Sequence, residues 1–484
     1  MSTNQFLEHL AGILPDERLL VRQEDLAPYE CDALTALREK PLAVAIPETE
    51  DEILKLLEAC RQHSIAVVTR GAGTGLSGGA RPVAGALLVS MMRFNRILEV
   101  DEENLTALVE PGVRNLAISE AVADKGLYYA PDPSSQLACS IGGNVAENAG
   151  GVHCLKYGLT VHNIVGLKVI TIDGHVHTLG NNTLESPGYD LTALMNGSEG
   201  MLAMITEIRV RLRVKPPIVR VILAAFDDIE QAGNAVSTII KAGIVPAGLE
   251  MMDGDAIKAV EDFAHAGYPL DAQAILLCEL DGLEAEVNAQ IETVTALLNE
   301  QGATEVRTSR DDQERMRFWA GRKSAFPAVG RISPDYYVMD GTIPRAALGT
   351  VLKQISAWSK EIGLSVANVF HAGDGNLHPL ILYNGNIPGE VEKAEELGLR
   401  ILTLSVELGG SITGEHGVGV EKLDAMCDQF NSDELALFHA LKEAFDPHSL
   451  LNPGKAVPSL HRCAELGAMH VHNGKLPFPE LDRF

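Results

Sequence analysis

The chain has 484 residues, of which 46% are apolar and 22% charged, a composition that is ordinary for a globular protein with two or three domains. Its formal net charge of −27 argues against nucleic acids and anionic lipid surfaces as partners, because both are themselves negatively charged. No window approaches the roughly 18 uninterrupted apolar residues of a membrane-spanning helix, so no direct membrane span is expected.

The first 216 residues have the pattern of an α+β domain behind a short helical segment. Residues 1–40 are expected to form that segment, which starts with an amphipathic helix. An apolar strand, a helix at 49–63 and a second strand at 64–70 then follow as a βαβ unit. Thr49 is the expected N-cap of the helix, because Glu52 follows three residues later, as in a capping box.

A glycine-rich loop follows this unit, with five glycines in the nine residues 71–79. Gly73, Gly75 and Gly78 have the spacing of a Rossmann fingerprint, but residues 79–90 leave no room for the helix that the fingerprint requires. The lysine of a P-loop is absent too. The loop is therefore predicted to hold a pyrophosphate through its backbone N–H groups, and a tight turn with several positive φ angles is the alternative.

Two further glycine-rich segments lie at 139–151 and 196–210. The Pro-Pro pair at 216–217 marks a change of pattern, after which strands and helices indicate a second α+β domain. The seven cysteines are scattered and form no C-x-x-C pair, which favours reduced thiols in the cytoplasm. Their scatter also argues against an iron–sulfur cluster within this chain.

The second domain contains the stretch HAGDGNLH, in which Asp374-Gly375 predicts a two-residue type I′ hairpin turn. Such a turn makes His371 and His378 direct cross-strand partners, with Cβ atoms about 4.5–5.5 Å apart. Two imidazoles at that distance can bind one divalent metal, and Glu415 in a later GEHG segment is a third candidate ligand. Each histidine taken singly is more often an ordinary polar side chain, and a longer loop or a bulge would break this register.

Together, the three glycine-rich segments resemble the FAD-binding domain of the vanillyl-alcohol oxidase and p-cresol methylhydroxylase family. The resemblance implies an α+β fold, with a two-part FAD-binding domain of the p-cresol methylhydroxylase type and a C-terminal, ferredoxin-like substrate or cap domain. Because residues 65–80 contain no histidine, the FAD is expected to be bound non-covalently. The residues that the resemblance assigns to FAD binding are Arg70, Gly71, Gly73, Thr74, Gly75, Pro131, Ser135, Gly142, Gly143, Asn148, Gly150, Gly151, Glu199, Gly200, Ile205 and Asn452.

The motifs H-x-G-D-G-N-x-H and G-E-H-G are similar to signatures of the FAD-linked D-2-hydroxyacid dehydrogenases within this family. The resemblance implies that His371, His378 and Glu415 bind a divalent metal, with zinc as the expected ion, and that His416 is the base that takes the hydroxyl proton. Arg322, in a W-x-x-R segment, is the implied group for the substrate carboxylate, and an exposed helix charge is the alternative. The implied domains are the helical segment 1–40, the FAD-binding domain 41–216, the substrate or cap domain 217–447 with the metal and base site, and the C-terminal return to the flavin with its tail at 448–484.

The implied reaction is the FAD-dependent oxidation of a small 2-hydroxy acid, glycolate to glyoxylate or D-lactate to pyruvate. Members of the resembled group that act on longer diacids have a Lys in the strand matching residues 335–344, and the absence of Lys and Arg there in this sequence implies a small monocarboxylate. Because the chain lacks a cluster motif, its electrons are expected to pass to a partner iron–sulfur subunit, beside a second flavin-type subunit, and on to quinone. The implied location is the cytoplasm, peripheral at the inner membrane through those partners.

Three other functions stay open at this point. A stand-alone FAD-linked D-lactate dehydrogenase would share the whole site, whereas a non-catalytic flavin-binding subunit would not need the histidine motifs. A zinc hydrolase would use the metal motif and leave the three glycine-rich segments without a role.

Overall fold

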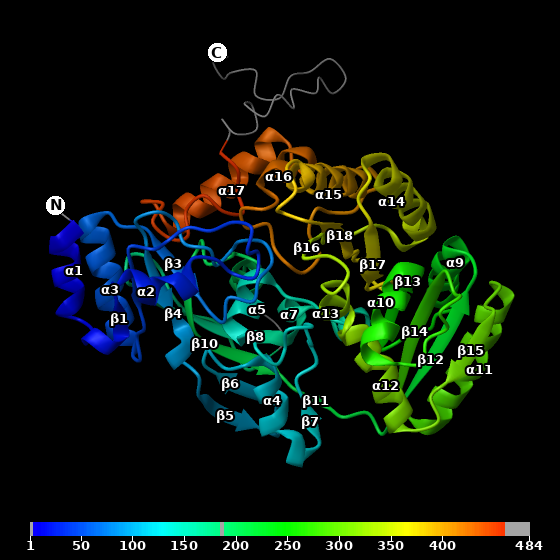
Figure 1. The fold of residues 1–484 in the computed structure, drawn as a ribbon. Coiled ribbons are helices and arrows are strands. Elements are labelled where there is room, and N and C mark those ends of the chain that lie inside the picture. Colours follow the sequence, from blue (N-terminus) through cyan, green and yellow to red (C-terminus); the bar gives the residue numbers. More distant parts are fainter. Residues whose placement is uncertain (1–2, 184–187, 460–484) are drawn as a thin grey trace. The chain divides into compact units, whose positions relative to one another are not determined.

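The computed structural model describes residues 3–183 and 188–459, and these form two compact units (Figure 1). The first unit comprises the described residues of Met1–Gly150, Leu159–Val214 and His416–Phe484. The second comprises Gly151–Gly158 and Lys215–Glu415. The chain therefore passes into the second unit twice, and the later passage ends between Glu415 and His416.

The first unit begins with a four-stranded sheet in the order β1 (Leu19–Leu20), β2 (Ala43–Ala45), β4 (Leu87–Ser90), β3 (Val67–Arg70). Strands β2 and β3 both pair parallel to β4, and helix α3 (Glu50–His63) connects them, as the βαβ pattern predicts. Thr49 is the N-cap of α3, and its side chain accepts a hydrogen bond from the N–H of Glu52 at 3.2 Å. No helix lies between β3 and β4, which confirms that the Rossmann spacing of this loop is incidental.

A second sheet of the first unit is antiparallel throughout, in the order β5 (Ile97–Asp101), β6 (Thr106–Val109), β10 (Met204–Arg211), β8 (Ile164–Ile170), β9 (Val176–Gly180). Each of the two sheets has its own hydrophobic core. The expected two-part FAD-binding architecture is therefore confirmed.

Short helices and the ends of the chain surround these sheets. The amino-terminal segment contains α1 (Thr3–Ala11) and α2 (Gln23–Leu26), and α1 buries Phe6 and Leu10 in the core of the first sheet. The remaining elements of this unit are α4 (Asn115–Ala121), α5 (Ile141–Glu147), α7 (Thr160–Asn163), α8 (Leu191–Met195), α16 (Leu423–Gln429), α17 (Ser432–Phe445) and the strand pair β7 (Leu127–Tyr128) with β11 (Arg213–Val214). Residues 460–484, most of the predicted C-terminal tail, lie outside the described residues.

The second unit is built on one antiparallel sheet in the order β15-β12-β14-β13-β17-β18-β16. Its first part follows the chain as β12 (Ile218–Phe226), α9 (Ile229–Lys241), β13 (Gly248–Asp253), α10 (Gly254–Ala264), β14 (Ala274–Gly282), α11 (Glu284–Glu300) and β15 (Glu305–Thr308). Apart from the added helix α10, this succession is the ferredoxin-like βαββαβ, as expected. Strands β17 (Val366–Phe370), β18 (Pro379–Tyr383) and β16 (Asp335–Val338) extend the sheet beyond β13.

Helices pack on this sheet in two groups. Helix α9 packs against both α11 and α14 (Leu348–Ile362), while α10 (Gly254–Ala264) packs against both α12 (Asp312–Lys323) and α13 (Ala325–Val329). Helix α15 (Glu390–Glu407) packs on α14 and β18. In Gly151–Gly158, the first segment of the second unit, helix α6 (Cys154–Tyr157) is bonded to β14, because the Tyr157 hydroxyl donates to Asp281 Oδ2 at 2.5 Å.

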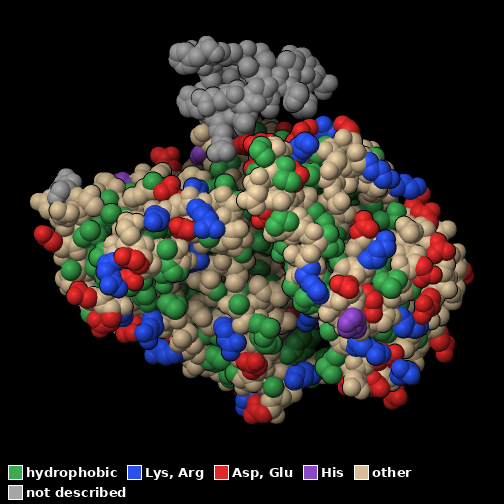
Figure 2. All heavy atoms as spheres, in the orientation of Figure 1, with side chains coloured by type: hydrophobic (Ala, Val, Ile, Leu, Met, Phe, Trp, Pro, Cys, Tyr) green, Lys and Arg blue, Asp and Glu red, His purple; other side chains and the backbone are tan. Residues whose placement is uncertain are grey.

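The surface and the thiols bear on the expected partners and location. On the face shown in Figure 2, acidic and basic side chains are interspersed over the described residues. None of the helices in residues 3–183 and 188–459 combines the length and the apolarity that crossing a membrane requires. Five cysteines of the described residues are free, namely Cys31, Cys60, Cys139, Cys154 and Cys278.

Candidate active site

The first two glycine-rich segments lie against each other in the first unit. Ser140 is the N-cap of α5, accepts from the N–H of Gly143 at 3.4 Å and also accepts from the N–H of Ala72 at 3.3 Å. A Cβ on Gly71 would lie 2.1 Å from Ser140 Oγ, and a Cβ on Gly142 would lie 2.5 Å from Pro111 Cβ. Glycine at position 71 therefore lets the two segments approach each other, and glycine at position 142 lets the second segment approach Pro111.

The third glycine-rich segment and the C-terminal return reach the same loop. Asn452 Nδ2 donates to the carbonyl oxygen of Gly79 at 3.0 Å and to that of Glu199 at 2.6 Å. The carboxylate of Glu199 accepts from the N–H groups of Val418 and Gly419, both at 2.7 Å. The return of the chain at Asn452 is thus a buried junction of three segments, not an ordinary surface turn.

The loop itself offers groups for an anionic ligand. The backbone N–H groups of Gly73, Thr74 and Gly75 donate to no other described residue. Gly73 has a φ of +72°, so part of the tight-turn alternative holds as well. Arg70, by contrast, points back into the protein and donates from Nη1 to the carbonyl oxygen of Cys31 at 2.7 Å. These N–H donors suit a pyrophosphate, so this loop fits the FAD that the sequence predicts.

The remaining residues predicted to bind FAD are distributed over the same unit. Asn148 ends α5 with a φ of +53°, and its side chain accepts from the N–H of Val161 at 2.9 Å. Ile205 lies in β10, next to the segment that holds Glu199 and Gly200, both with positive φ. Pro131, Ser135 and Gly150 also lie in this unit, whereas Gly151 is the first residue of the second unit.

The hairpin that carries the two histidines has a different turn from the one predicted. Asp374 has no positive φ, so a type I′ turn does not form; Gly375, with a φ of +84°, closes a longer loop. Strands β17 and β18 pair Ala367 with Leu380, and the same register pairs His371 with Asn376. The prediction that His371 directly faces His378 is therefore wrong by two residues.

The two histidines nevertheless meet, because a shift of two residues leaves both side chains on the same face of the hairpin. Their rings lie edge to face, with centroids 5.1 Å apart. The Nε2 atoms of His371 and His378 lie 3.2 and 2.9 Å from the same oxygen of Glu415, Oε1. The side chains of all three residues are buried or nearly so, being at most 11% exposed. The structure thus places these three predicted ligands together in the second unit.

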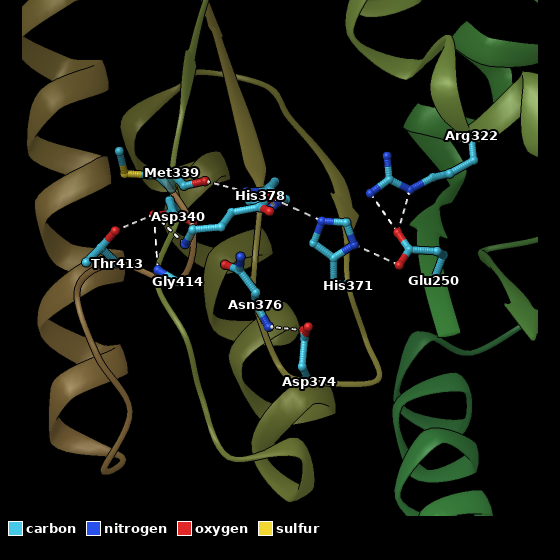
Figure 3. Close-up of polar contacts among 11 residues, drawn as sticks. Glu250, Arg322, Met339, Asp340, His371, Asp374, Asn376, His378, Thr413 and Gly414 are labelled. Atoms are coloured by element: carbon cyan, nitrogen blue, oxygen red, sulfur yellow. Dashed lines mark hydrogen bonds and ion pairs between the residues drawn. The ribbon is translucent and has the colours of Figure 1, made fainter. Parts of the chain in front are cut away.

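The other nitrogen of each imidazole is held by the protein, as Figure 3 shows. His378 Nδ1 lies 3.1 Å from the carbonyl oxygen of Met339, and His371 Nδ1 lies 2.7 Å from Oε1 of Glu250. Metal-binding histidines are normally anchored in this way through their second nitrogen. Two imidazole nitrogens and one carboxylate oxygen, all within 4.8 Å of one another, form a donor set that fits a divalent ion such as zinc and leaves a coordination position open.

A second acidic residue positions the loop that carries Glu415. Asp340 is fully buried and accepts hydrogen bonds from the hydroxyl of Thr413 at 2.6 Å and from the N–H groups of Gly414 and Glu415 at 3.0 and 3.1 Å (Figure 3). The residue before it, Met339, holds His378. The two residues that follow β16 (Asp335–Val338) therefore orient two of the three candidate ligands.

Arg322 is not an exposed helix charge, because only 2% of its surface is accessible. Its Nε and Nη2 atoms donate to one oxygen of Glu250, Oε2, at 2.8 and 2.7 Å, and the other oxygen of Glu250 reaches His371. In Figure 3 Glu250 lies between the two side chains. The structure thus joins Arg322 to the histidine cluster through one buried carboxylate.

The charges of this cluster are mutually stabilised. Burial alone would raise the pKa of the Glu250 carboxyl, but His371 and Arg322 outweigh it and hold that pKa below its usual value. Burial likewise opposes ionisation of Glu415, yet His371 and His378 hold its pKa well below the usual range. Burial would lower the pKa of His371, and Glu250 and Glu415 instead raise it well above its usual value. Both carboxylates are therefore ionised at neutral pH and available as acceptors.

Glu250, Met339 and Asp340 were not predicted from the sequence. Met339 acts through its backbone, which no side-chain pattern reveals. Glu250 and Asp340 each stand as one acidic residue in an apolar strand sequence, AGLEMM and YYVMDG. A charged residue in such a strand is a signal that could have identified both, because a buried charge needs a partner. His416, the predicted base, is the first residue after the second unit and follows Glu415 directly.

Two protein families match successive parts of the chain. Residues 41–180 match the family described as FAD binding domain, and residues 215–456 match the C-terminal domain of FAD linked oxidases. Glycolate oxidase subunit GlcD of Escherichia coli (strain K12) is 61% identical over 477 residues, covering 99% of this chain and 95% of the relative. A D-lactate dehydrogenase of Anaerostipes hadrus is 29% identical over 463 residues, with coverages of 94% and 97%.

The fold resembles that of a solved p-cresol methylhydroxylase with bound substrate. The TM-score is 0.80 at 18% sequence identity, and the match covers 95% of this chain and 97% of that chain. At this identity the likeness concerns the fold alone. It confirms the expected architecture, while the two family matches confirm the expected cofactor, FAD.

Proposed function

Because the chain belongs to the FAD-linked oxidase family and is thus an FAD-dependent oxidoreductase, we propose that it oxidises glycolate to glyoxylate. The observation that carries the proposal is the convergence of His371 Nε2 and His378 Nε2 on one oxygen of Glu415, in a chain that also has the FAD-binding domain. The 61% identity to a protein named glycolate oxidase subunit GlcD supports glycolate as the substrate. A zinc hydrolase loses its support, because it gives the FAD-binding domain no role.

The FAD would be held non-covalently by the three glycine-rich segments and by the return at Asn452. The N–H groups of Gly73, Thr74 and Gly75 are the donors that suit its pyrophosphate. His371, His378 and Glu415 would hold the metal, for which zinc fits the mixed nitrogen and oxygen donor set. When bound, FAD supplies a two-electron acceptor, and a divalent cation lowers the pKa of a hydroxyl group that it binds.

The residues of the chain would bind the substrate and move its proton. Arg322 is the proposed group for the substrate carboxylate, since Glu250 occupies Nε and Nη2 and leaves the hydrogens of Nη1 available. His416 is the proposed base, which takes the hydroxyl proton while the Cα–H bond breaks and two electrons leave with that hydrogen. The bond between Cα and the hydroxyl oxygen becomes the C=O bond of glyoxylate, so that atoms and charges balance.

The size of the substrate follows from the charges nearby. Residues 335–344, which include Met339 and Asp340 of the histidine site, carry no Lys or Arg. A second carboxylate would therefore find no cation there, which favours a monocarboxylate such as glycolate or D-lactate. The 29% identity to a D-lactate dehydrogenase supports D-lactate as a further substrate and a stand-alone D-lactate dehydrogenase as the alternative function.

We also propose that the chain works as one subunit of a larger complex. No C-x-x-C pair occurs in the sequence, so the electrons would pass to a partner iron–sulfur subunit, beside a second flavin-type subunit, and on to quinone. The name of the relative in Escherichia coli, a subunit of glycolate oxidase, supports this assembly. A cytoplasmic location, peripheral at the inner membrane through the partners, would follow from it.

The proposal is tested by mixing the purified, FAD-loaded and metal-loaded chain with glycolate under anaerobic conditions, with D-lactate in parallel. Bleaching of the flavin absorbance is expected with both acids and a higher rate with glycolate. A yellow protein that neither acid bleaches would refute catalysis by this chain and favour a non-catalytic flavin-binding subunit. His416→Ala should retain its FAD and reduce it at least a hundredfold more slowly, as expected when a general base is lost; near-normal reduction would remove His416 from that role.

A further inference from the structure

We propose that Glu250 is a positioning residue that sets the tautomer of His371 and the orientation of Arg322 at the same time. Its side chain is 1% exposed, so water does not compete for its two oxygens. Oε1 lies 2.7 Å from His371 Nδ1, and Oε2 lies 2.8 and 2.7 Å from Nε and Nη2 of Arg322 (Figure 3). One carboxylate therefore connects the candidate metal site to the candidate substrate cation.

The direction of each hydrogen bond follows from the chemistry of the groups. A guanidinium has only donors, so Oε2 must accept from Arg322. Glu250 forms a buried ion pair with the Arg322 guanidinium, and a carboxylate in such a pair offers only acceptors, so Oε1 accepts as well. His371 must then carry its hydrogen on Nδ1, which leaves Nε2 as the nitrogen that faces Glu415 and would bind the metal.

The strand register makes this arrangement a property of the fold. Strand β13 pairs with β17 so that Met251 faces Phe370, and the next pair in this register is Glu250 with His371. Beyond that pair, the N–H of Gly373 donates to the carbonyl oxygen of Leu249 at 2.9 Å. The carboxylate and the imidazole are therefore held side by side by backbone pairing on both sides of them.

The amide variant Glu250→Gln separates this role from simple packing, because Gln has the same shape but one donor and one acceptor. Arg322 can only donate, so it requires the amide oxygen. The amide NH₂ must then point at His371 Nδ1, which has to accept, and the imidazole hydrogen moves to Nε2. A nitrogen that carries a hydrogen cannot bind a metal, so the variant should fold and still bind zinc poorly. In serine proteases, replacing the triad aspartate by asparagine reverses the tautomer of its histidine in the same way while the geometry is kept.

The prediction becomes specific when Arg322 is removed as well. In Glu250→Gln with Arg322→Met, no donor claims the amide oxygen, so the amide can turn and accept from His371 Nδ1. Zinc binding should therefore return in the double variant, although a second side chain has been lost. Purely structural damage would add up in the double variant and would not be reversed by the second substitution.

Glu279 provides a matched control on the neighbouring strand β14. It is also a buried glutamate with several partners, because its oxygens lie 2.9 Å from His153 Nε2, 2.5 Å from Trp319 Nε1 and 3.9 Å from Arg315 Nη1. None of these partners belongs to the histidine cluster. Glu279→Gln therefore removes a buried carboxylate beside a histidine in the same unit and should leave zinc binding unchanged.

The experiment measures the zinc affinity of the full-length, FAD-loaded and metal-stripped chain by competition with a chromophoric chelator. Circular dichroism and flavin absorbance of each variant report whether it folds. Glu250→Gln should lose affinity by about 10- to 100-fold, the usual effect of removing a partner of a metal-binding histidine. Arg322→Met and the double variant should differ from each other by less than about threefold, because in both an oxygen of residue 250 is able to accept from His371 Nδ1.

The inference rests on the proposed function for the metal and for the role of Arg322, and the readouts keep the two apart. A wild-type chain that binds no zinc would refute the metal site and this inference together. Wild-type binding with equal binding by Glu250→Gln, or a double variant as weak as Glu250→Gln, would overturn the inference alone. If Glu250→Gln does not fold, Arg322→Met decides on its own: Glu250 keeps His371 in place there, so zinc affinity should persist, and its loss would contradict the assignment.

Discussion

Replacing Lys442 tests how the C-terminal return is held in the first unit. Lys442 lies in α17, and its ammonium group uses its three hydrogens on the carbonyl oxygens of Met201 and Leu451, both at 2.7 Å, and on Asp446 Oδ2 at 2.5 Å. The side chains of the two charged residues are 9% and 0% exposed. Because Met201 belongs to the third glycine-rich segment and Leu451 precedes Asn452, this one ammonium group fixes the return of the chain beside the FAD-binding loop.

The loss of stability in Lys442→Met follows from the burial of Asp446, which stays in the protein without its cation. Removing one member of a buried ion pair costs about 3–5 kcal/mol, because the other charge stays buried without compensation. Asp446 keeps the N–H groups of Leu450 and Leu451 as donors at 3.1 and 2.7 Å, which favours the lower end of that range. Lys442→Met should therefore lower the free energy of unfolding by about 3 kcal/mol, which is more than a hundredfold in the unfolding equilibrium constant.

A surface pair of the same chemistry serves as the control. Lys55 and Asp51 in α3 have the same four-residue spacing and approach to 2.6 Å, but their side chains are 57% and 72% exposed. Lys55→Met should leave stability unchanged within error, since solvent screens such a pair. Urea unfolding of both variants without FAD, followed by circular dichroism, makes the comparison. Equal shifts of the two midpoints would refute the argument from burial, and so would a failure of Asp446→Asn to recover part of the loss in the Lys442→Met background.

Three further outcomes follow from local geometry. Gly142→Ala should lower the FAD content, because the new Cβ would lie 2.5 Å from Pro111. The control Gly126→Ala, whose Cβ meets nothing within 4 Å, should retain FAD. Equal FAD content in the two variants would contradict this explanation. Gly410→Ala places a Cβ 1.9 Å from the carbonyl oxygen of Thr342 and should weaken zinc binding, because the segment leading to Glu415 has to move. In the control Gly409→Ala the new Cβ meets nothing within 4 Å, and the variant should lose only about 1–2 kcal/mol of stability because of its positive φ. If zinc affinity fell equally in both variants, displacement of the segment leading to Glu415 would not be the cause. Burial raises the pKa of Asp253 from 3.8 to about 6, so the folded chain holds this proton between about pH 4 and 6 while the unfolded chain has lost it. The stability of the wild type relative to Asp253→Asn should therefore fall, by about 3 kcal/mol, as the pH rises through that window, and a difference that does not change with pH would exclude this carboxyl as the cause.

The glycine-rich segments were predictable because glycine has a strong local meaning. The distances from Gly71 to Ser140 and from Gly142 to Pro111 leave no room for a side chain, so glycine is needed at these two positions, where segments from different parts of the chain touch. The absence of a helix after the loop was equally local, since it followed from Pro and Gly. What glycine spacing could not reveal was the buried junction at Asn452, which depends on carbonyl oxygens of Gly79 and Glu199 that are far away in the sequence.

The hairpin shows why a correct site can follow from an incorrect register. The dipeptide Asp374-Gly375 favours a two-residue turn, but Gly373 bonds to Leu249 in the neighbouring strand and Gly375 closes a longer loop. That tertiary contact overrides the local preference. Because side chains alternate along a strand, a shift of one residue would have separated His371 from His378, whereas the observed shift of two leaves them on the same face.

The two histidines are anchored by groups of different kinds, and this difference has a consequence for the site. His378 is held by the carbonyl oxygen of Met339, which only accepts and which no substitution at position 339 removes. His371 is held by the carboxylate of Glu250, which can be replaced and which Arg322 shares. The tautomer of His378 is therefore set by the fold, whereas that of His371 depends on one side chain that also serves the candidate substrate cation. A substitution at Glu250 should therefore affect the metal site and the orientation of Arg322 together, whereas Arg322→Met should leave the anchor of His371 in place.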